Sequence, residues 1–251
     1  MSSVAISLIV FGCTFGGALL GLFLRAVLPE HHLTDETRDV VKLGMGLVGT
    51  MSALLLGLLV ASAKNLYDNA ATDLTQMSAK VVFLDRLLAN YGDQTKEARA
   101  TLRQALTRAI DRIWPSDSSQ SAQLDPSAAG AEVLYHQLYD LKPETDMQRE
   151  LKERALGAAT DVGQLRWLLF EQSTPDTSTP FLIVIVFWLT IIFISFGLFA
   201  PLNGTVVATL FLCALSVCGA FFMILELTHP FDGLIRISSS ALSSALAHLG
   251  S

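Results

Sequence analysis

Cysteine is scarce in this sequence and is confined to its most apolar parts. Three cysteines occur in 251 residues, namely Cys13, Cys213 and Cys218, and each lies inside a long apolar run. In such a setting a thiol behaves as a small hydrophobic group. The sequence therefore excludes a disulfide framework and a thiolate metal site. We expect neither a metal nor a cofactor.

The signatures of enzymes and of nucleic-acid-binding proteins are also missing. The sequence has no HExxH pattern, no glycine-rich phosphate-binding loop and no recognisable Ser/His/Asp order. Its net charge of −6 is opposite in sign to the clustered basic face that binds nucleic acid. We therefore predict a protein that is not an enzyme and that has no nucleic-acid partner.

Charge is absent from the interior of four long apolar runs. These runs lie near residues 4–28, 43–63, 180–200 and 205–227, and charged residues occur only at their ends. Each run is close to the roughly 20 residues that a helix needs to cross a membrane, and helices that are apolar on every face are typical of buried or membrane-spanning segments. The sequence therefore predicts an all-α integral membrane protein, with four transmembrane helices and a helical-bundle insert between spans two and three.

The insert has the spacing of packed helices. Apolar or small residues recur three and four positions apart from Tyr67 to Tyr91 and again from Met147 to Leu169, a heptad pattern typical of coiled coils. No helix breaker separates the second run from Tyr67, so we expect one helix to continue from the membrane into the insert. The heptad faces serve either the core of a monomeric bundle or contacts between subunits.

These patterns divide the chain into four segments. We predict a first transmembrane hairpin at 1–63, a helical aqueous insert continuous with the spans at 64–178, a second transmembrane hairpin at 179–228 and a C-terminal amphipathic tail at 229–251. The serine-rich tail is expected to lie along the membrane surface. An even number of spans places the insert and both termini on one side. We expect this to be the cytoplasmic side of the cell inner membrane, because the insert lacks cysteine and no export signal is evident.

A series of arginines follows one predicted helix of the insert, near 94–114. Its apolar residues, including Leu102, Leu106 and Ile113, share one face of the helix. The arginines that lie off this face are Arg99, Arg103, Arg108 and Arg112. Such a series is typical of a solvated face, and attraction of an anion is the second interpretation.

Small residues in the first two runs indicate close packing between helices. Without a Cβ atom, glycine lets two helices approach closely, which replaces the missing hydrophobic driving force in lipid. The first run therefore packs either against the second run or against another subunit. The candidate packing residues are Gly12, Gly16, Gly17, Gly21, Gly49 and Gly57.

One titratable cluster is expected at a membrane boundary, where the fourth run ends. It consists of Glu226, His229 and Asp232, with Pro230 ending the helix between them. Ionisable groups at a membrane boundary are functional candidates, although a boundary position also lets them reach water. The cluster is either a structural cap or a gating or ion site.

Several stretches together resemble a known family. They are Ser52 to Gly57, Leu84 to Gly92, the pairs Ala98-Arg99 and Leu102-Arg103, Ile113 to Pro115, and Pro230 to Ser238. The chain is thereby similar to the bestrophin-like family of small bacterial four-span membrane proteins. Bestrophins are oligomeric anion channels whose second span lines the pore, so the resemblance implies a homo-oligomer, a pentamer by analogy, that is surrounded by membrane lipid and passes inorganic ions.

The same resemblance implies which residues line the pore. The positions of the second run near the expected constriction are Leu54, Leu55, Leu56, Leu58 and Leu59. Bestrophins have an aromatic neck, whereas the second run contains no phenylalanine. The resemblance therefore leaves the ion selectivity open.

Two other functions compete with an ion channel. One is a non-conducting membrane scaffold or sensor whose helical insert binds a protein partner, which would fit the heptad faces and a flexible loop at 116–126. The other is a stator-like subunit of an ion-driven complex, which shares the two-plus-two layout of spans. A stator needs a partner with an intramembrane carboxylate, and the centres of these spans contain none.

Overall fold

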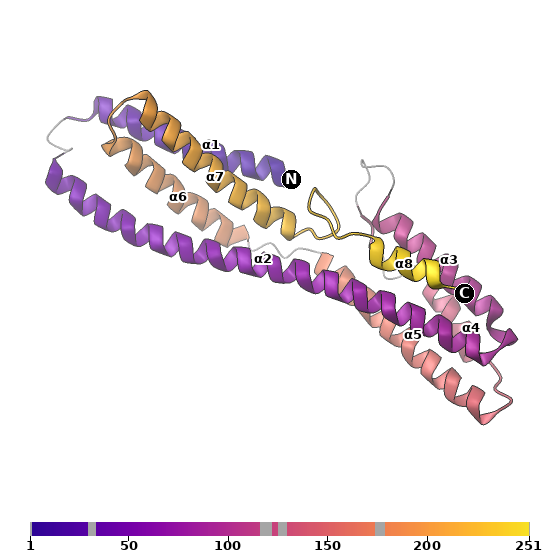
Figure 1. The fold of residues 1–251 in the computed structure, drawn as a ribbon. Helices are drawn as coiled ribbons and strands as arrows, with labels where there is room; N and C mark the ends of the chain where they lie inside the picture. The colour runs from indigo at the N-terminus through magenta and orange to yellow at the C-terminus, as the bar shows by residue number, and fades with distance from the viewer. Residues whose placement is uncertain (1, 30–33, 116–121, 125–129, 174–178, 251) are drawn as a thin grey trace. The chain divides into compact units, whose positions relative to one another are not determined.

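The computed structural model describes residues 2–29, 34–115, 122–124, 130–173 and 179–250, and each regular element in these segments is a helix (Figure 1). The predicted all-α class is confirmed. The predicted loop at 116–126 lies outside the described residues except for Ala122, Gln123 and Leu124. The elements are α1 (Ser3–Val27), α2 (Asp35–Tyr91), the 3₁₀ turn η2 (Asp93–Thr95), α3 (Lys96–Ile113), α4 (Gly130–Tyr139), α5 (Asp146–Ser173), α6 (Thr179–Phe199), α7 (Gly204–Leu227) and α8 (Ser240–His248).

The chain forms two compact units. The first unit contains Met1–Asn65 and Asp176–Thr228, and the second contains Leu66–Pro175 and His229–Ser251. Four of the described helices, α1, α2, α6 and α7, are long and apolar enough to cross a membrane. They coincide with the four apolar runs of the sequence.

In the first unit, α1 packs against both α6 and α7. The apolar contacts include Ala18 and Leu22 of α1, Phe193 of α6, and Leu210 and Ala214 of α7, all of which are buried. The short turn between α6 and α7 ends at Asn203, which caps α7: its side-chain oxygen accepts a hydrogen bond from the Val206 N–H at 2.8 Å. The second hairpin therefore brackets the first helix.

Glycines bring the backbones of α1 and α6 into contact. A Cβ atom on Gly21 would collide with the carbonyl of Ile194, and a Cβ atom on Gly197 would collide with the carbonyl of Ala18. Gly17 of α1 faces Thr190 of α6. The structure thus places Gly17 and Gly21 against the third span rather than the second. Apart from the adjacent residues and backbone of the same helix, no described atom lies within 4 Å of a Cβ built on the other candidates, Gly12, Gly16, Gly49 and Gly57, so their packing role stays a prediction.

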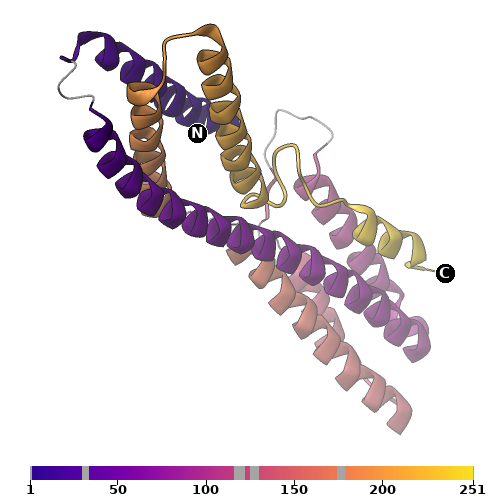
Figure 2. The same ribbon diagram turned by 60° about the vertical axis from the view of Figure 1, so that its left-hand side comes forward.

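Helix α2 runs without a break from Asp35 to Tyr91 (Figures 1 and 2). No proline interrupts this stretch, so nothing removes a backbone hydrogen bond along it. The predicted continuous helix is confirmed. It ends at Gly92, whose φ of 116° lies in the left-handed region that glycine adopts most easily.

The second unit has a core built on the predicted heptad faces. Helices α2, α3, α4 and α5 contribute to it. On α5, Met147 is 68% exposed, so the predicted heptad face begins only after the first turn of that helix. The buried residues of α2 in this core are Ala70, Leu74, Met77, Val81, Leu84, Leu87 and Leu88.

The C-terminal segment belongs to the same core. Leu242, Ala245 and Leu249 are buried with the residues of α2 and α3, and the Ser78 hydroxyl donates a hydrogen bond to the Ala241 carbonyl at 2.6 Å. Our expectation that this tail lies along a membrane surface is therefore wrong. The segment is amphipathic as predicted, but protein covers its apolar face.

A single added methyl group is expected to separate α1 from α6. Gly21→Ala should lower the free energy of unfolding by about 1–3 kcal/mol, as overpacking does elsewhere, because the obstacle is backbone that cannot rotate away. Gly16→Ala is the matched control, since no described atom lies within 4 Å of its Cβ. Unfolding in mixed micelles, followed by circular dichroism, measures both variants. Equal stabilities of the two variants would contradict the close approach.

Candidate functional site

The membrane part of α2 carries a narrow stripe of exposed apolar side chains. Its members recur three or four positions apart and therefore share one face of the helix. Each is at least 45% exposed within the single chain. They are Val40, Leu43, Leu47, Met51, Leu54 and Leu58. We call this set the α2 apolar stripe.

The structure distributes the five candidate pore leucines over two faces of α2. Leu54 and Leu58 belong to the α2 apolar stripe and are 77% and 65% exposed. The other three, Leu55, Leu56 and Leu59, are partly buried and pack against a cluster of Val10, Ile185 and Phe221. Leu54 and Leu58 are thus the two of the five whose side chains are clearly exposed in the single chain.

A second exposed stripe of α2 is made of small residues. It lies beside the α2 apolar stripe, about 100° around the helix, because four of its members each stand one position before a member of that stripe. Helices with such a surface can approach one another closely in lipid. The members are Gly46, Thr50, Ala53, Gly57 and Ala61, all exposed. We call this set the α2 small-residue stripe.

The boundary residues Glu226, His229 and Asp232 do not fall in one unit. Glu226 lies in the last turn of α7 in the first unit and is only 4% exposed. His229 and Asp232 belong to the second unit, where the Asp232 carboxylate accepts a hydrogen bond from the Ala122 N–H at 3.0 Å. A shared gating or ion site at these three residues stays a prediction.

In the second unit, Trp114 holds the segment that leads to α8. Its indole Nε1–H donates a hydrogen bond to the Ile237 carbonyl at 2.8 Å, and its ring meets that of Phe231 edge-on at 6.2 Å. The Ile237 N–H donates to the Pro230 carbonyl at 2.8 Å, which closes the loop between them. Trp114 therefore fixes both ends of this loop.

A buried ion pair holds the last described residues. Asp85 is 2% exposed and accepts two hydrogen bonds from Arg99, at 2.8 Å from Nε and 2.9 Å from Nη2. The Gly250 N–H also donates to this carboxylate at 3.3 Å, and Arg103 donates to the Leu249 carbonyl at 3.2 Å. We call these contacts, with those of Trp114, the C-terminal anchor. Arg99, which we expected on a solvated face, is instead paired.

The ion pair is charged at neutral pH. Burial raises the pKa of Asp85, but the hydrogen bonds from Arg99 and from the Gly250 N–H, with the positive charge of Arg99, outweigh it and leave the pKa below its usual value. The hydrogen bond to Asp85 raises the pKa of Arg99 despite partial burial. A carboxylate that accepts charge-assisted hydrogen bonds from a planar guanidinium is a strong and directional contact.

The sequence contained a signal for this pair that our reasoning missed. Asp85 stands four positions after Val81 and three before Leu88, so it satisfies the heptad spacing as well as Leu84 does. A carboxylate on a buried helical face needs a paired cation. The arginines of the following helix are cations that could meet this requirement.

Comparison with known protein families matches residues 12–242 to the bestrophin-like domain. The chain belongs to the bestrophin-like family. Among solved structures, a bacterial bestrophin homologue from Klebsiella pneumoniae, which carries a mutation, matches with a TM-score of 0.69 over 99% of this chain and 98% of that one. At 12% identity this likeness shows the fold. No curated protein matches.

Family membership relates the contacts described above to the stretches that carry the family resemblance. The family and the apolar helices together mark this chain as a membrane protein. Most of the stretches that carry the family resemblance meet at the C-terminal anchor, including those of Asp85, Arg99, Trp114 and Phe231. These stretches therefore specify how the end of the chain docks on the helical insert.

Loss of the Asp85 charge is expected to destabilise the second unit. Asp85→Asn leaves Arg99 partly buried without its anion, which costs about 3–5 kcal/mol in buried pairs; the lower end applies because the Arg99 side chain is 25% exposed. Asp161→Asn is the control, because its pair with Lys80 is about half exposed and should contribute less than about 1 kcal/mol. Urea unfolding followed by circular dichroism measures both.

The same pair predicts how stability depends on pH. The pKa of Asp85 is lower in the folded state, so its contribution is complete above the unfolded carboxyl pKa of about 3.9 and is lost as pH falls below that value. The Asp85→Asn variant should lack this part of the acid-induced loss. Identical acid profiles for the variant and the parent would contradict a stabilising charged pair.

Trp114→Phe is expected to loosen the C-terminal segment without unfolding the unit. The variant keeps an aromatic ring against Phe231 but loses the hydrogen bond to Ile237. This loss should lower the stability of the docked segment by about 0.5–1.5 kcal/mol. Hydrogen exchange of the amides from 231 to 249 should become faster. Trp167→Phe, at a position that is 59% exposed, should leave that exchange unchanged. Equal protection in both variants would show that the indole N–H does not hold the segment.

Proposed function

We propose that this protein is a subunit of an oligomeric ion channel of bestrophin-like layout, in which α2 lines the pore. The family and the fold support a channel. The observation that carries the assignment of the pore is the α2 apolar stripe, which α1, α6 and α7 leave exposed. A central axis bordered by this helix from each subunit would give the stripe its neighbours.

Leu54 and Leu58 form the proposed constriction. They are the members of the α2 apolar stripe within the candidate set. A ring of leucine side chains narrows a pore and can close it by excluding water. Leu55, Leu56 and Leu59 support this ring from behind, because they pack against the neighbouring spans of the same chain.

The α2 small-residue stripe is the proposed contact between subunits. It lies beside the α2 apolar stripe, so a helix that turns one stripe to a lumen can turn the other to a neighbour. Exposed Gly57 and Ala53 would let two subunits approach closely. The number of subunits, five, rests on analogy with bestrophins alone.

Anions are the proposed permeating ions, again by kinship with bestrophins. The span itself carries no charged side chain between Leu43 and Ala63, so the leucine constriction would act as a gate rather than as a charge filter. Glu226, His229 and Asp232 are the proposed gating residues. We place the protein in the cell inner membrane, with lipid around the spans and with the insert and both termini in the cytoplasm.

Polar substitution in the constriction is expected to open the channel. Leu54→Ser and Leu58→Ser wet the narrow part of the pore, so purified protein in planar bilayers should show a several-fold higher open probability or conductance. Leu8→Ser is the matched control, because Leu8 is 61% exposed but belongs to α1 and not to the helix that is proposed to line the pore. Leu56→Ala should mainly lower the free energy of unfolding. Because Leu56 is partly buried, we expect the low end of the roughly 2–5 kcal/mol that buried leucines lose.

The absence of currents in bilayers that contain correctly assembled parent protein would contradict the proposal. The scaffold or sensor function would then be favoured. Equal effects of Leu8→Ser and Leu58→Ser on the currents would be compatible with a channel but would contradict a pore lined by α2. Size and subunit count of the purified protein, measured by mass photometry, establish that the assembly under test is intact.

A further inference from the structure

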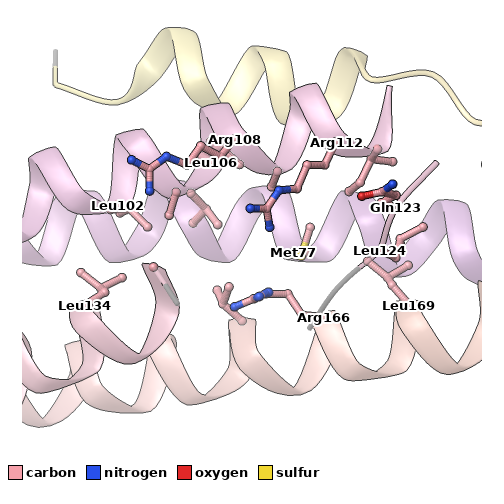
Figure 3. A pocket seen from close by; sticks show the side chains of 16 residues that line it. Met77, Leu102, Leu106, Arg108, Arg112, Gln123, Leu124, Leu134, Arg166 and Leu169 are labelled. Carbon is pink, nitrogen blue, oxygen red and sulfur yellow. The ribbon is translucent and has the colours of Figure 1, made fainter. Parts of the chain in front are cut away.

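The second unit contains a cavity that neither the channel function nor the C-terminal anchor uses. Its volume is about 160 Å³, and it lies among α2, α3, α4, α5 and residues 122–124 (Figure 3). Sixteen residues line it. Twelve of these are apolar or glycine, among them Met77, Leu102, Leu106, Leu134 and Leu169.

The remaining lining residues are one glutamine and three arginines. Gln123 lies at the end near Leu124, Arg108 and Arg112 come from α3, and Arg166 comes from α5 (Figure 3). No aspartate or glutamate is among the sixteen, although the chain as a whole has a net charge of −6. Among the described residues, the lining therefore combines apolar side chains with arginine charges and has no carboxylate.

The positive charge of Arg108 and Arg112 is not neutralised within the described part of the chain. Neither guanidinium forms an ion pair there. Asp111, which lies between them in sequence, does not line the cavity, and Asp161 on α5 is paired with Lys80 at 2.6 Å. The two arginines thus keep their donors available at the edge of the cavity.

The arginine series of α3 separates into two functions. Arg99 pairs with Asp85, and Arg103 binds the Leu249 carbonyl, so these two residues hold the end of the chain. Arg108 and Arg112, five and nine residues after Arg103, line the cavity instead. Attraction of an anion, the second interpretation of this series, fits these two positions.

We propose that this cavity binds a single-chain amphiphile with an anionic head, namely a medium-chain carboxylate. The apolar chain would occupy the space between Leu102, Leu106 and Leu134, where it is removed from water. The carboxylate would accept hydrogen bonds from the Arg108 and Arg112 guanidiniums, whose planar donors match its geometry.

The size of the cavity favours one chain over two. A cavity of roughly 150 Å³ is enough to hold benzene, and this cavity has about 160 Å³. The inner part of one short chain fits that volume, with the rest of the chain and its head toward the open edge, whereas two long chains do not fit.

Equilibrium dialysis of labelled decanoate tests the proposal. The full chain is placed in nanodiscs of zwitterionic lipid, and binding to empty discs is subtracted. We expect saturable binding of about one decanoate per chain. Decanol, which has the same chain without the charge, should bind more weakly by a factor of at least ten.

Charge removal and filling of the cavity separate the two parts of the site. The double variant Arg108→Gln, Arg112→Gln should weaken decanoate binding at least tenfold and leave decanol binding unchanged. Arg154→Gln is the control, because this arginine pairs with Glu150 on the exposed surface of α5. Ala109→Phe, which places a ring in the cavity, should weaken binding of both probes while circular dichroism stays unchanged.

Two results would overturn the proposal. Decanoate retained no better by the protein than by empty discs, or equally by the parent and the double arginine variant, would show that the cavity has no such ligand. Discs that contain anionic phosphatidylglycerol distinguish the source of the anion. Loss of decanoate binding in those discs would assign the cavity to a membrane lipid and not to a free carboxylate.

Discussion

The buried ion pair of Asp85 and Arg99 is the contact on which the second unit depends. It joins α2 to α3 across the turn at Gly92, and the same carboxylate also holds the Gly250 N–H. Because a buried charge is costly without its partner, loss of either partner would weaken the contacts among all three elements. The apolar cluster that contains Leu84, Leu88 and Leu242 belongs to the same unit.

The first unit is organised by a different constraint, because lipid gives apolar helices no hydrophobic reason to associate. Close backbone packing of α1 on α6 takes that role. Among the residues that the structure describes, the exposed part of α2 has no comparable partner, as the α2 apolar stripe shows. An assembly of several chains would complete this helix, which is consistent with the channel that we propose.

Much of the fold could be predicted because it follows from periodicity and composition. The apolar runs, the unbroken α2 and the heptad face from Ala70 to Leu88 depend only on local sequence. Partners could not be predicted in this way: an amphipathic segment such as 240–249 has the same pattern whether membrane or protein covers it. For the same reason, the row of leucines from Leu54 to Leu59 did not reveal which members face outward. The pairing of Asp85 with Arg99 required knowledge of the turn between their helices.

The reciprocal packing of Gly21 and Gly197 has a consequence for the history of the family. Each glycine faces the backbone of the opposite helix, so enlarging either one pushes the same two helices apart. The two positions are then constrained jointly, and a larger residue at one is tolerable only if the helices shift at both. Across related chains, these positions should vary together, as a single inherited character rather than as two independent ones.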